Sequence, residues 1–178
     1  MVPELPAPWG PFLLAVDQAL PRPVALHCLG GFVLALRYGL PRPTQDVDYV
    51  EIVPADQRAV LEAVAGLESA LARRHRVYCQ HVTVASLPEA YEDRLTELVP
   101  GRFEHLRLFG LDPYDLALSK LGRNSPVDRE DVAFLARVVP LDPIVLQARY
   151  RAELRPTIIG DVDRDDWTLA LWIEAYWR

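Results

Sequence analysis

The sequence predicts an α/β (α+β) protein in which a small mixed sheet is flanked by helices and followed by a helical C-terminal part. Two observations predict this class. Short runs of strand character alternate with helical patterns over residues 1–111, and only helical patterns remain over residues 112–178. The chain has 178 residues, 51% of them hydrophobic, which suffices for one sizeable core. We therefore expect a single compact unit, with the helical part packed on the α/β core.

The elements of the core follow from the spacing of apolar residues. Helical spacing predicts helices, whereas short apolar or alternating runs bounded by glycine and proline predict strands. Gly30 and Gly31 interrupt the first apolar run and predict a turn that opens a helix. The expected strands are residues 24–29, 44–53, 77–85 and 103–109, and the expected helices are residues 8–20, 32–40, 55–76 and 88–98.

The C-terminal part reads as four helices over residues 113–122, 126–138, 143–154 and 167–177. An Asp161-Val162-Asp163 sequence precedes the last of them, but no glycine turn precedes it in a suitable place. Asp165 and Asp166 lead into a helix as capping acids do. We therefore interpret this acidic segment as a helix start and not as a metal site.

Composition excludes several classes of protein. A net charge of −6 argues against a wide basic face for nucleic acid, and the one basic run, residues 73–76, ends a helix, where cations are favoured. No apolar run is long enough to span a bilayer and the N-terminus lacks signal-peptide features, so a cytoplasmic protein is expected. Cys28 and Cys79 lie far apart without ligand spacing, which predicts small buried side chains rather than a zinc site or a disulfide.

Asp46 and Asp48 are the first candidate ligands. Residues two apart on a strand point to the same face, so this pair presents two carboxylates together. Magnesium is usually held by one or two carboxylates with water and substrate phosphates. The alternative is a strand end with two solvated acids.

The glycine pair favours the magnesium site over two solvated acids. Gly30 and Gly31 open a helix about fifteen residues before the acids, where backbone amides and the helix N-terminus favour a phosphate. An ordinary turn is the alternative for a lone glycine pair. Together, the two features supply both halves of a nucleoside triphosphate site: amides for the phosphates and carboxylates for the metal.

Two segments then resemble a known family. The stretch LHCLGGFVLALRYGLPRPTQDVDYVEI resembles the signature of the nucleotidyltransferase superfamily, a glycine turn followed by an Asp-x-Asp strand. The stretch DPYDLALSKLGRNSPVDREDVAFL is similar to a second pattern of the minimal bacterial branch, which includes abortive-infection toxins of toxin–antitoxin pairs. The resemblance covers residues 24–53 and 112–135 and implies a nucleotidyltransferase fold.

The resemblance implies a role for each matching residue. Gly30 and Gly31 would cradle the triphosphate, Asp46 and Asp48 would hold magnesium, and Lys120 and Asp128 would complete the catalytic site. Lys120 is the one lysine among 19 basic residues, and an ammonium can neutralise phosphate charge during transfer. Asp128 would orient Lys120 or act as a base. Its alternative is a capping box, because Ser125 and Pro126 precede it with the right spacing.

Three further residues are nucleotide-binding candidates. Arg42 and Thr44 precede the acidic strand and could contact phosphate or nucleotide, although a polar turn after Pro41 explains them equally well. Arg123 lies one turn beyond Lys120, where it could reach a phosphate or simply favour a helix C-terminus.

One departure from the family concerns a third carboxylate, which many nucleotidyltransferases carry on a neighbouring strand. The stretch VYCQHVTVAS has no acid, and Glu104 is the nearest strand candidate. Glu51 lies at odd spacing from the pair and should face away from it.

The first hypothesis is a magnesium-dependent nucleotidyltransferase that moves a nucleoside monophosphate from a triphosphate to an acceptor hydroxyl. The resemblance implies tRNA or protein as acceptor and an antitoxin as partner, and no membrane partner is expected. The second hypothesis is an inactive domain that binds nucleotide or a partner protein, which the missing acid favours. The third, an α/β protein with no nucleotide role, requires both motif segments to match by coincidence.

Overall fold

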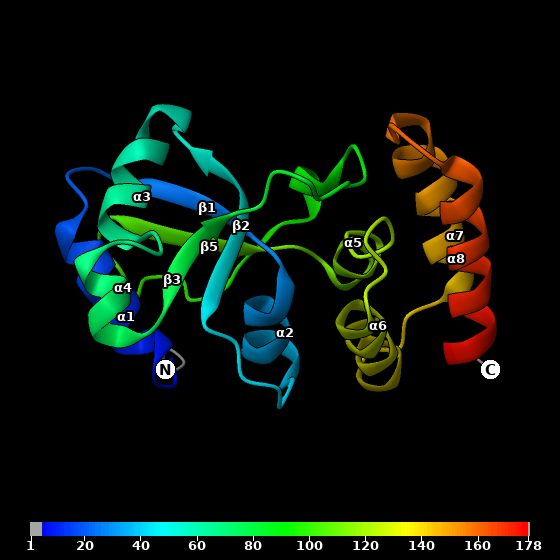
Figure 1. The fold of residues 1–178 in the computed structure, drawn as a ribbon, viewed down its shortest axis with the longest axis horizontal. Coiled ribbons are helices and arrows are strands. Elements are labelled where there is room, and N and C mark those ends of the chain that lie inside the picture. Colours follow the sequence, from blue (N-terminus) through cyan, green and yellow to red (C-terminus); the bar gives the residue numbers. More distant parts are fainter. Residues whose placement is uncertain (1–4, 178) are drawn as a thin grey trace. The chain divides into compact units, whose positions relative to one another are not determined.

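A computed structural model describes residues 5–177 and divides the chain into two compact units (Figure 1). The first unit contains the residues up to Thr83 together with Leu95–Gly110. The second contains Val84–Arg94 and the chain from Leu111 onward. The chain therefore crosses from one unit to the other three times.

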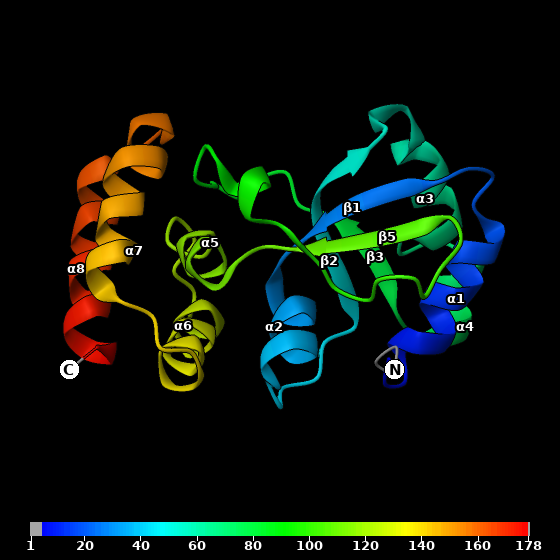
Figure 2. The same ribbon diagram turned by 180° about the vertical axis from the view of Figure 1, so that it is seen from behind.

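The first unit is built on one mixed sheet of five strands in the order β3-β2-β1-β5-β4. β1 pairs antiparallel with β2 and parallel with β5, which lies beside it in Figure 2; β2 pairs parallel with β3, and β4 antiparallel with β5. This confirms the predicted mixed sheet. The strands are β1 (Val24–Cys28), β2 (Asp46–Val53), β3 (Tyr78–His81), β4 (Thr96–Glu97) and β5 (Leu106–Gly110).

Alternation along β2 fixes which side chains face the core. Val47 and Tyr49 are buried, and the two aspartates between and before them are half-buried on the opposite face. The register between β1 and β2 then shifts by one residue, so that Tyr49 and Ile52, three apart, are both buried. Odd or even spacing therefore predicts which face a side chain of β2 is on only from Asp46 to Tyr49.

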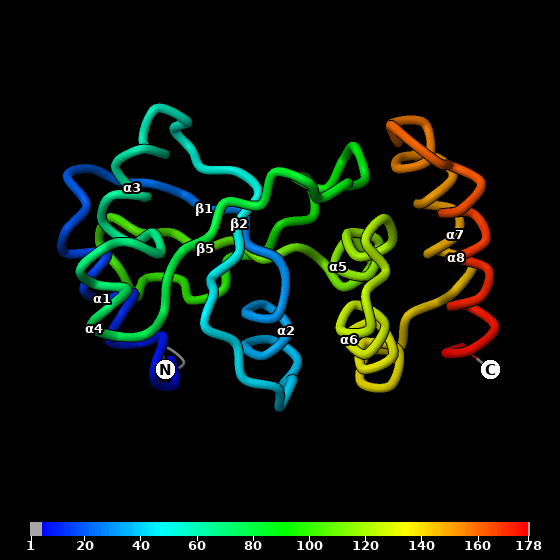
Figure 3. The backbone as a smooth tube through the Cα atoms, viewed as in Figure 1, coloured from blue at the N-terminus to red at the C-terminus, as the bar shows by residue number. Residues whose placement is uncertain are grey.

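Four α-helices belong to the first unit: α1 (Trp9–Ala19), α2 (Gly30–Tyr38), α3 (Arg58–Ala65) and α4 (Ala70–His75), with a 3₁₀ turn, η1 (Ala55–Gln57), before α3. α1, α3 and α4 pack together beside the sheet (Figure 1). Phe12, Leu13 and Val16 of α1 are completely buried there. The trace in Figure 3 follows the chain from β1 directly into α2 and back through a loop into β2. That route brings the glycine pair at the start of α2 and the two aspartates at the start of β2 to the same end of β1.

Two predicted helices need correction. The single helix expected over residues 55–76 is broken after Ala65, where Gly66 ends α3 and the Ser69 side chain caps α4. The helix expected over residues 88–98 is wrong: this stretch forms a 3₁₀ turn, η2 (Tyr91–Arg94), followed by β4. The segment has only a weak helical pattern, and the hydrogen bonds from Arg94 to Asp115 and Glu153 hold it in a different conformation.

The second unit is helical, as predicted, with α5 (Pro113–Leu118), α6 (Pro126–Val138), α7 (Pro143–Arg149) and α8 (Val162–Tyr176). A π-helical turn, η3 (Tyr150–Leu154), and a 3₁₀ turn, η4 (Arg155–Thr157), extend α7. α5, α6 and α7 each start with an acid or serine cap followed by proline, which explains why the sequence placed their starts correctly. The last helix starts at Val162, earlier than the predicted residue 167.

A buried ionic network explains why residues 84–94 belong to the helical unit. The Arg94 guanidinium donates to Asp115 at 2.9 and 3.1 Å and to Glu153 at 2.8 Å. Arg149 donates to Asp112 at 2.7 Å and to Asp115 at 3.0 Å. Asp115 is completely buried, so removal of either arginine would leave a poorly compensated charge. Sequence patterns cannot reveal this pairing because the partners lie 21 to 59 residues apart.

Among the described residues, no helix has the length and apolar character needed to cross a membrane.

Candidate active site

The turn between β1 and α2 presents backbone amides at the end of the sheet. Gly30 has a φ of +72°, a left-handed conformation that glycine adopts without strain. The Leu29 N–H donates to the Asp48 carbonyl at 3.1 Å, which fastens the turn to β2. The N-cap residue of α2, Leu29, makes no side-chain hydrogen bond to the first turn, and the N–H groups of such a turn can bind an anionic ligand.

Asp48 lies directly against this turn. A Cβ atom placed on Gly30 would stand 2.5 Å from Asp48 Oδ2, well inside van der Waals contact. Glycine at position 30 is therefore needed for two reasons: its backbone conformation, and the space that the Asp48 carboxylate occupies. A Cβ on Gly31 would meet Thr44 Cβ at 3.4 Å and Arg42 Nη2 at 3.6 Å.

The structure thus brings six predicted residues of the first unit together at one end of the sheet. We call this group the glycine–aspartate site; it consists of Gly30, Gly31, Arg42, Thr44, Asp46 and Asp48. Thr44 was predicted to contact nucleotide, but its hydroxyl donates a hydrogen bond to Asp46 Oδ1. The threonine therefore orients a carboxylate, and the other Asp46 oxygen has no such hydroxyl donor.

The donor set suits magnesium. Asp46 and Asp48 are half-buried carboxylates on one face of β2, and Asp48 lies directly against the glycine turn. Over residues 5–177, no cluster of three or more His, Cys, Asp or Glu side chains forms a metal-binding group. Two carboxylates are enough for magnesium when water and substrate phosphates complete its octahedron.

The neighbouring strand β3 contributes two side chains that the sequence interpretation did not single out. Tyr78 pairs in register with Asp46, and Gln80 with Asp48, while Cys79 between them is buried opposite Val47. Partial burial and the nearby charges of Asp46 and Asp48 raise the pKa of Tyr78, so the site has a negative field that favours a cation. The alternation of side-chain direction along the sequence YCQH could have predicted that Tyr78 and Gln80 share one face of the strand.

Glu104, the candidate for a third acid, does not join the pair, and Glu51, which was expected to face away, is paired elsewhere. Glu104 precedes β5, and the neighbouring His105 carbonyl accepts a hydrogen bond from Val24 at the start of β1. Because β1 and β2 are antiparallel, Asp46 lies at the other end of β1. Glu51 lies 3.6 Å from Arg58 of the helix that follows β2. The position opposite Asp48 is occupied by Gln80.

A second group of predicted residues lies in the helical unit. We call it the Lys120 cluster; it consists of Lys120, Arg123, Asp128 and Asp131. Lys120 is buried, and its Nζ donates to Asp131 at 2.7 Å and lies 3.6 Å from Asp128. The sequence interpretation gave Asp131 no role. Its position one helical turn after Asp128 was the usable signal.

Asp128 is completely buried and its oxygens are fully engaged. It accepts hydrogen bonds from Arg123 at 2.6 and 2.7 Å and from the Ser125 N–H and hydroxyl at 2.9 and 2.8 Å. These contacts include the capping box that was the alternative interpretation. Burial raises the pKa of Asp128, but the hydrogen bonds and the Lys120 charge together hold it well below its usual range. Such a carboxylate suits orientation of Lys120 and Arg123 better than proton abstraction at neutral pH.

Two structural interpretations from the sequence are confirmed. The Asp161 side chain accepts a hydrogen bond from the Arg164 N–H, so the acidic segment starts α8 as expected, but the cap is Asp161. Asp165 and Asp166, expected as the capping acids, lie inside the helix. Cys28 and Cys79 are buried and unbridged, and burial raises the pKa of both thiols.

Comparison with protein families shows to which family the chain belongs. Residues 15–170 match a family described as nucleotidyltransferase of unknown function (DUF6036). The protein belongs to this nucleotidyltransferase family. The match spans both the glycine–aspartate site and the Lys120 cluster, so both motif segments lie within the family's domain. No curated protein and no solved structure matches the chain.

Proposed function

We propose that the protein is a magnesium-dependent nucleotidyltransferase that transfers a nucleoside monophosphate from a nucleoside triphosphate to an acceptor hydroxyl and releases pyrophosphate. One observation carries this proposal: Gly30 leaves the space that the Asp48 carboxylate fills, at a helix N-terminus whose N-cap residue, Leu29, makes no side-chain hydrogen bond. Phosphate-binding amides and metal-binding carboxylates are thus adjacent, as a metal-bound triphosphate requires.

Each residue of the glycine–aspartate site has a distinct task in this scheme. N–H groups at the start of α2 hydrogen-bond phosphate oxygens, and Asp46 and Asp48 hold magnesium, with Thr44 fixing the orientation of Asp46. Bound magnesium supplies charge neutralisation at the phosphates. Arg42 lies beside Gly31 and is the guanidinium of this site that could contact a phosphate.

The Lys120 cluster contributes positive charge in the same proposal. The family resemblance gives Lys120 the task of neutralising phosphate charge during transfer, and Arg123 that of binding a phosphate oxygen. The Arg123 side chain is 70% exposed although Asp128 holds its guanidinium, which suits a residue that meets a ligand. Asp128 and Asp131 act by positioning these two cations.

The acceptor follows from the family resemblance rather than from any residue of the site. Relatives that act as toxins of toxin–antitoxin pairs make tRNA the first acceptor to test and protein the second. In that setting the chain would have a cognate antitoxin as partner. The net charge of −6 restricts contact with RNA to a local surface.

One observation favours a second candidate function. The position opposite Asp48 on β3 is Gln80, not an acid, which weakens metal binding relative to a three-carboxylate site. A domain of this kind could bind a nucleotide without turnover and serve as a sensor or as a partner-binding module. The Thr44–Asp46 hydrogen bond argues for the active enzyme, because orientation of a ligand matters most when a metal is held.

The decisive experiment is transfer of label from α-labelled ATP, GTP, CTP and UTP, with magnesium, to total RNA and to lysate protein. The wild-type protein is compared with Asp46→Ala/Asp48→Ala and with Glu104→Ala, which removes an exposed acid at the other end of β1. Label transferred by wild type and Glu104→Ala alone would establish the enzyme and its acceptor class. No transfer, with magnesium-dependent thermal stabilisation by a triphosphate, would support the binding module instead.

A further inference from the structure

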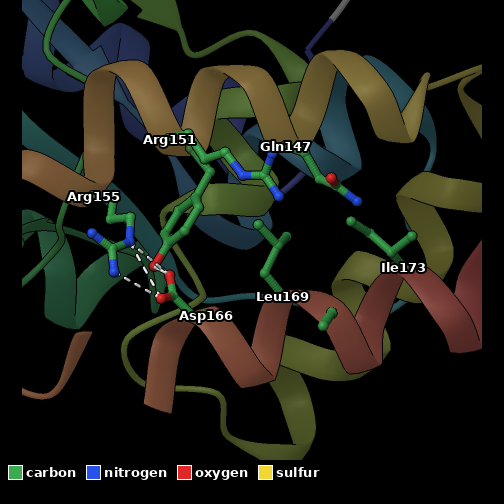
Figure 4. Close-up of a pocket in the computed structure, with 8 residues that line it drawn as sticks. Gln147, Arg151, Arg155, Asp166, Leu169 and Ile173 are labelled. Atoms are coloured by element: carbon green, nitrogen blue, oxygen red, sulfur yellow. Dashed lines mark hydrogen bonds and ion pairs between the residues drawn. The ribbon is translucent and has the colours of Figure 1, made fainter. Parts of the chain in front are cut away.

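A groove in the helical unit lies apart from the Lys120 cluster in sequence and has no role in nucleotidyl transfer. It runs between α8 and the helix formed by α7 and its π-helical turn, and its volume is about 250 Å³ (Figure 4). Its floor is apolar: Leu169, Ala170 and Ile173 come from α8. Figure 4 shows Leu169 and Ile173 directed toward Gln147 and Arg151 on the opposite helix. Apolar floor and polar wall therefore face each other.

One end of the groove is closed by a paired carboxylate. Asp166 accepts a hydrogen bond from the Tyr150 hydroxyl at 2.7 Å and from Arg155 at 2.9 and 3.0 Å. It is the one acid among the residues that line the groove. Arg155 hydrogen-bonds both oxygens of Asp166, so a further cation in the groove interacts with this carboxylate only at longer range.

Arg151 is that further cation. It is exposed, and within residues 5–177 no carboxylate lies within ion-pair distance of it. Gln147, one helical turn earlier, is half-buried, and in the same part of the chain its side-chain amide makes no hydrogen bond. Two strong donors thus stand side by side over an apolar floor without an internal acceptor.

The π-helical turn aligns these donors with the closed end. In an α-helix, a residue four positions on lies about 40° beyond a full turn, so side chains at such spacing drift around the axis. The wider turn of η3 rotates less per residue and so reduces this drift after Arg151, and Gln147, Arg151 and Arg155 all line the groove. Single π-helical turns inside helices are frequent at functional sites.

We propose that this groove binds a small anionic ligand whose phosphate or carboxylate pairs with Arg151 and Gln147, and whose apolar or aromatic body lies on Leu169 and Ile173. The groove has a net positive charge, from two arginines and one aspartate, on a chain with a net charge of −6. Charge complementarity therefore selects an anion, and the apolar floor selects one with a hydrophobic body.

The test titrates the whole chain with four probes while ¹H–¹⁵N shifts and binding heats are recorded. Phenyl phosphate and benzoate carry both the oxyanion and the apolar body, inorganic phosphate lacks the body, and benzyl alcohol lacks the charge. We expect the first two to bind with shift changes centred on α7 and α8, and each of the others to bind at least about tenfold more weakly. Preference for phenyl phosphate or for benzoate would identify the natural ligand as a phosphate or a carboxylate.

Variants locate the binding. Arg151→Gln should weaken phenyl phosphate at least about tenfold, whereas Arg137→Gln, which removes an exposed arginine of α6, should leave it unchanged. Ala170→Trp adds an indole at an exposed position on the floor and should block both aryl probes. Unfolding temperatures of the variants show that they are folded.

Three results would overturn the proposal: no binding of either aryl probe, equal phenyl phosphate affinity in Arg151→Gln and Arg137→Gln, or equal affinity for phenyl phosphate and benzyl alcohol. Binding of inorganic phosphate as tightly as phenyl phosphate would also contradict it, because the apolar floor would then have no role.

Discussion

The glycine–aspartate site and the Lys120 cluster place the same functional group in two different environments. Asp46 and Asp48 are half-buried, and Asp48 lies directly against a glycine turn that opens a helix. Asp128 and Asp131 are almost completely buried, and lysine and arginine of the same chain neutralise them. Carboxylates of the first kind can take a ligand from solution, whereas carboxylates of the second kind organise the protein's own cations.

The largest expected effect comes from breaking the buried pairs. Asp128→Ala should lower the free energy of unfolding by about 3–5 kcal/mol, because it leaves Lys120 buried with one fewer counterion and removes the capping box. Chemical denaturation measures the change. A loss below about 1 kcal/mol would mean that Asp128 contributes no more than an exposed pair.

The same pair should make stability depend on acid pH. The folded-state pKa of Asp128 is depressed, so its contribution is fully present above the unfolded pKa of about 3.9 and is lost as pH falls through the folded pKa. The difference in unfolding temperature between wild type and Asp128→Asn should therefore narrow steadily as pH falls below about 4. A constant difference down to pH 2 would contradict the assignment.

The sequence predicted the local features of these two regions and missed the contacts between residues far apart in the chain. The glycine–aspartate site was predictable because its residues lie within one strand, turn, helix and strand, where side-chain direction follows from local period. The capping box at Ser125 and Asp128 was local too. Contacts over long separations were not predictable: Gln80 opposite Asp48 depends on strand pairing, which no local pattern specifies.

Two further features escaped prediction for the same physical reason. The segment 84–94 has a weak helical pattern, but the bonds from Arg94 to Asp115 and Glu153 fix it in another form. The register shift beyond Tyr49 ends the simple alternation of β2, and it arises from pairing with β1. Local propensity was overruled wherever distant partners supplied more free energy.

The second largest effect tests the ligand-facing carboxylates. Asp48→Asn should lower nucleotidyl transfer more than about 100-fold, since loss of a metal ligand exceeds the 10- to 100-fold cost of a lost supporting contact. The unfolding temperature should change little, because the amide has the same shape and the site is half-buried. Kinetics of wild type, Asp48→Asn and Glu104→Gln measure this; unaltered transfer by Asp48→Asn would remove Asp48 from the site.

An intermediate effect on activity distinguishes the steric contact of a side chain at position 30 with Asp48 from the backbone strain of any side chain at positive φ. Gly30→Ala and Gly39→Ala both place a side chain at positive φ, which costs about 1–2 kcal/mol of stability in each case. Only the Cβ at position 30 meets Asp48, because nothing lies within 4 Å of the one at position 39. Gly30→Ala should therefore lose a further 10- to 100-fold in transfer. Equal activities of the two variants, compared at equal folded fraction, would show that the contact with Asp48 is unimportant.

The smallest expected effect concerns the orientation of Asp46. Thr44→Val removes the hydroxyl that donates to Asp46 Oδ1 while keeping the side-chain shape, and it should reduce transfer by about tenfold through weaker magnesium affinity. Thr83→Val, at an exposed position of the same unit, serves as the control. A magnesium titration of initial rates distinguishes them; an unchanged magnesium requirement in Thr44→Val would assign the hydroxyl another role.

The interior position of β5, between β1 and β4 in the sheet, has a consequence for biosynthesis. β1 carries the chain into the glycine turn, yet one of its two neighbours, β5, ends only at Gly110. As the polypeptide leaves the ribosome, residues 84–94 emerge before β5 although their partners Asp115 and Glu153 follow it. The sheet that carries the glycine–aspartate site is therefore complete only when Gly110 has left the ribosome, and by then residues 84–94 of the helical unit have already emerged.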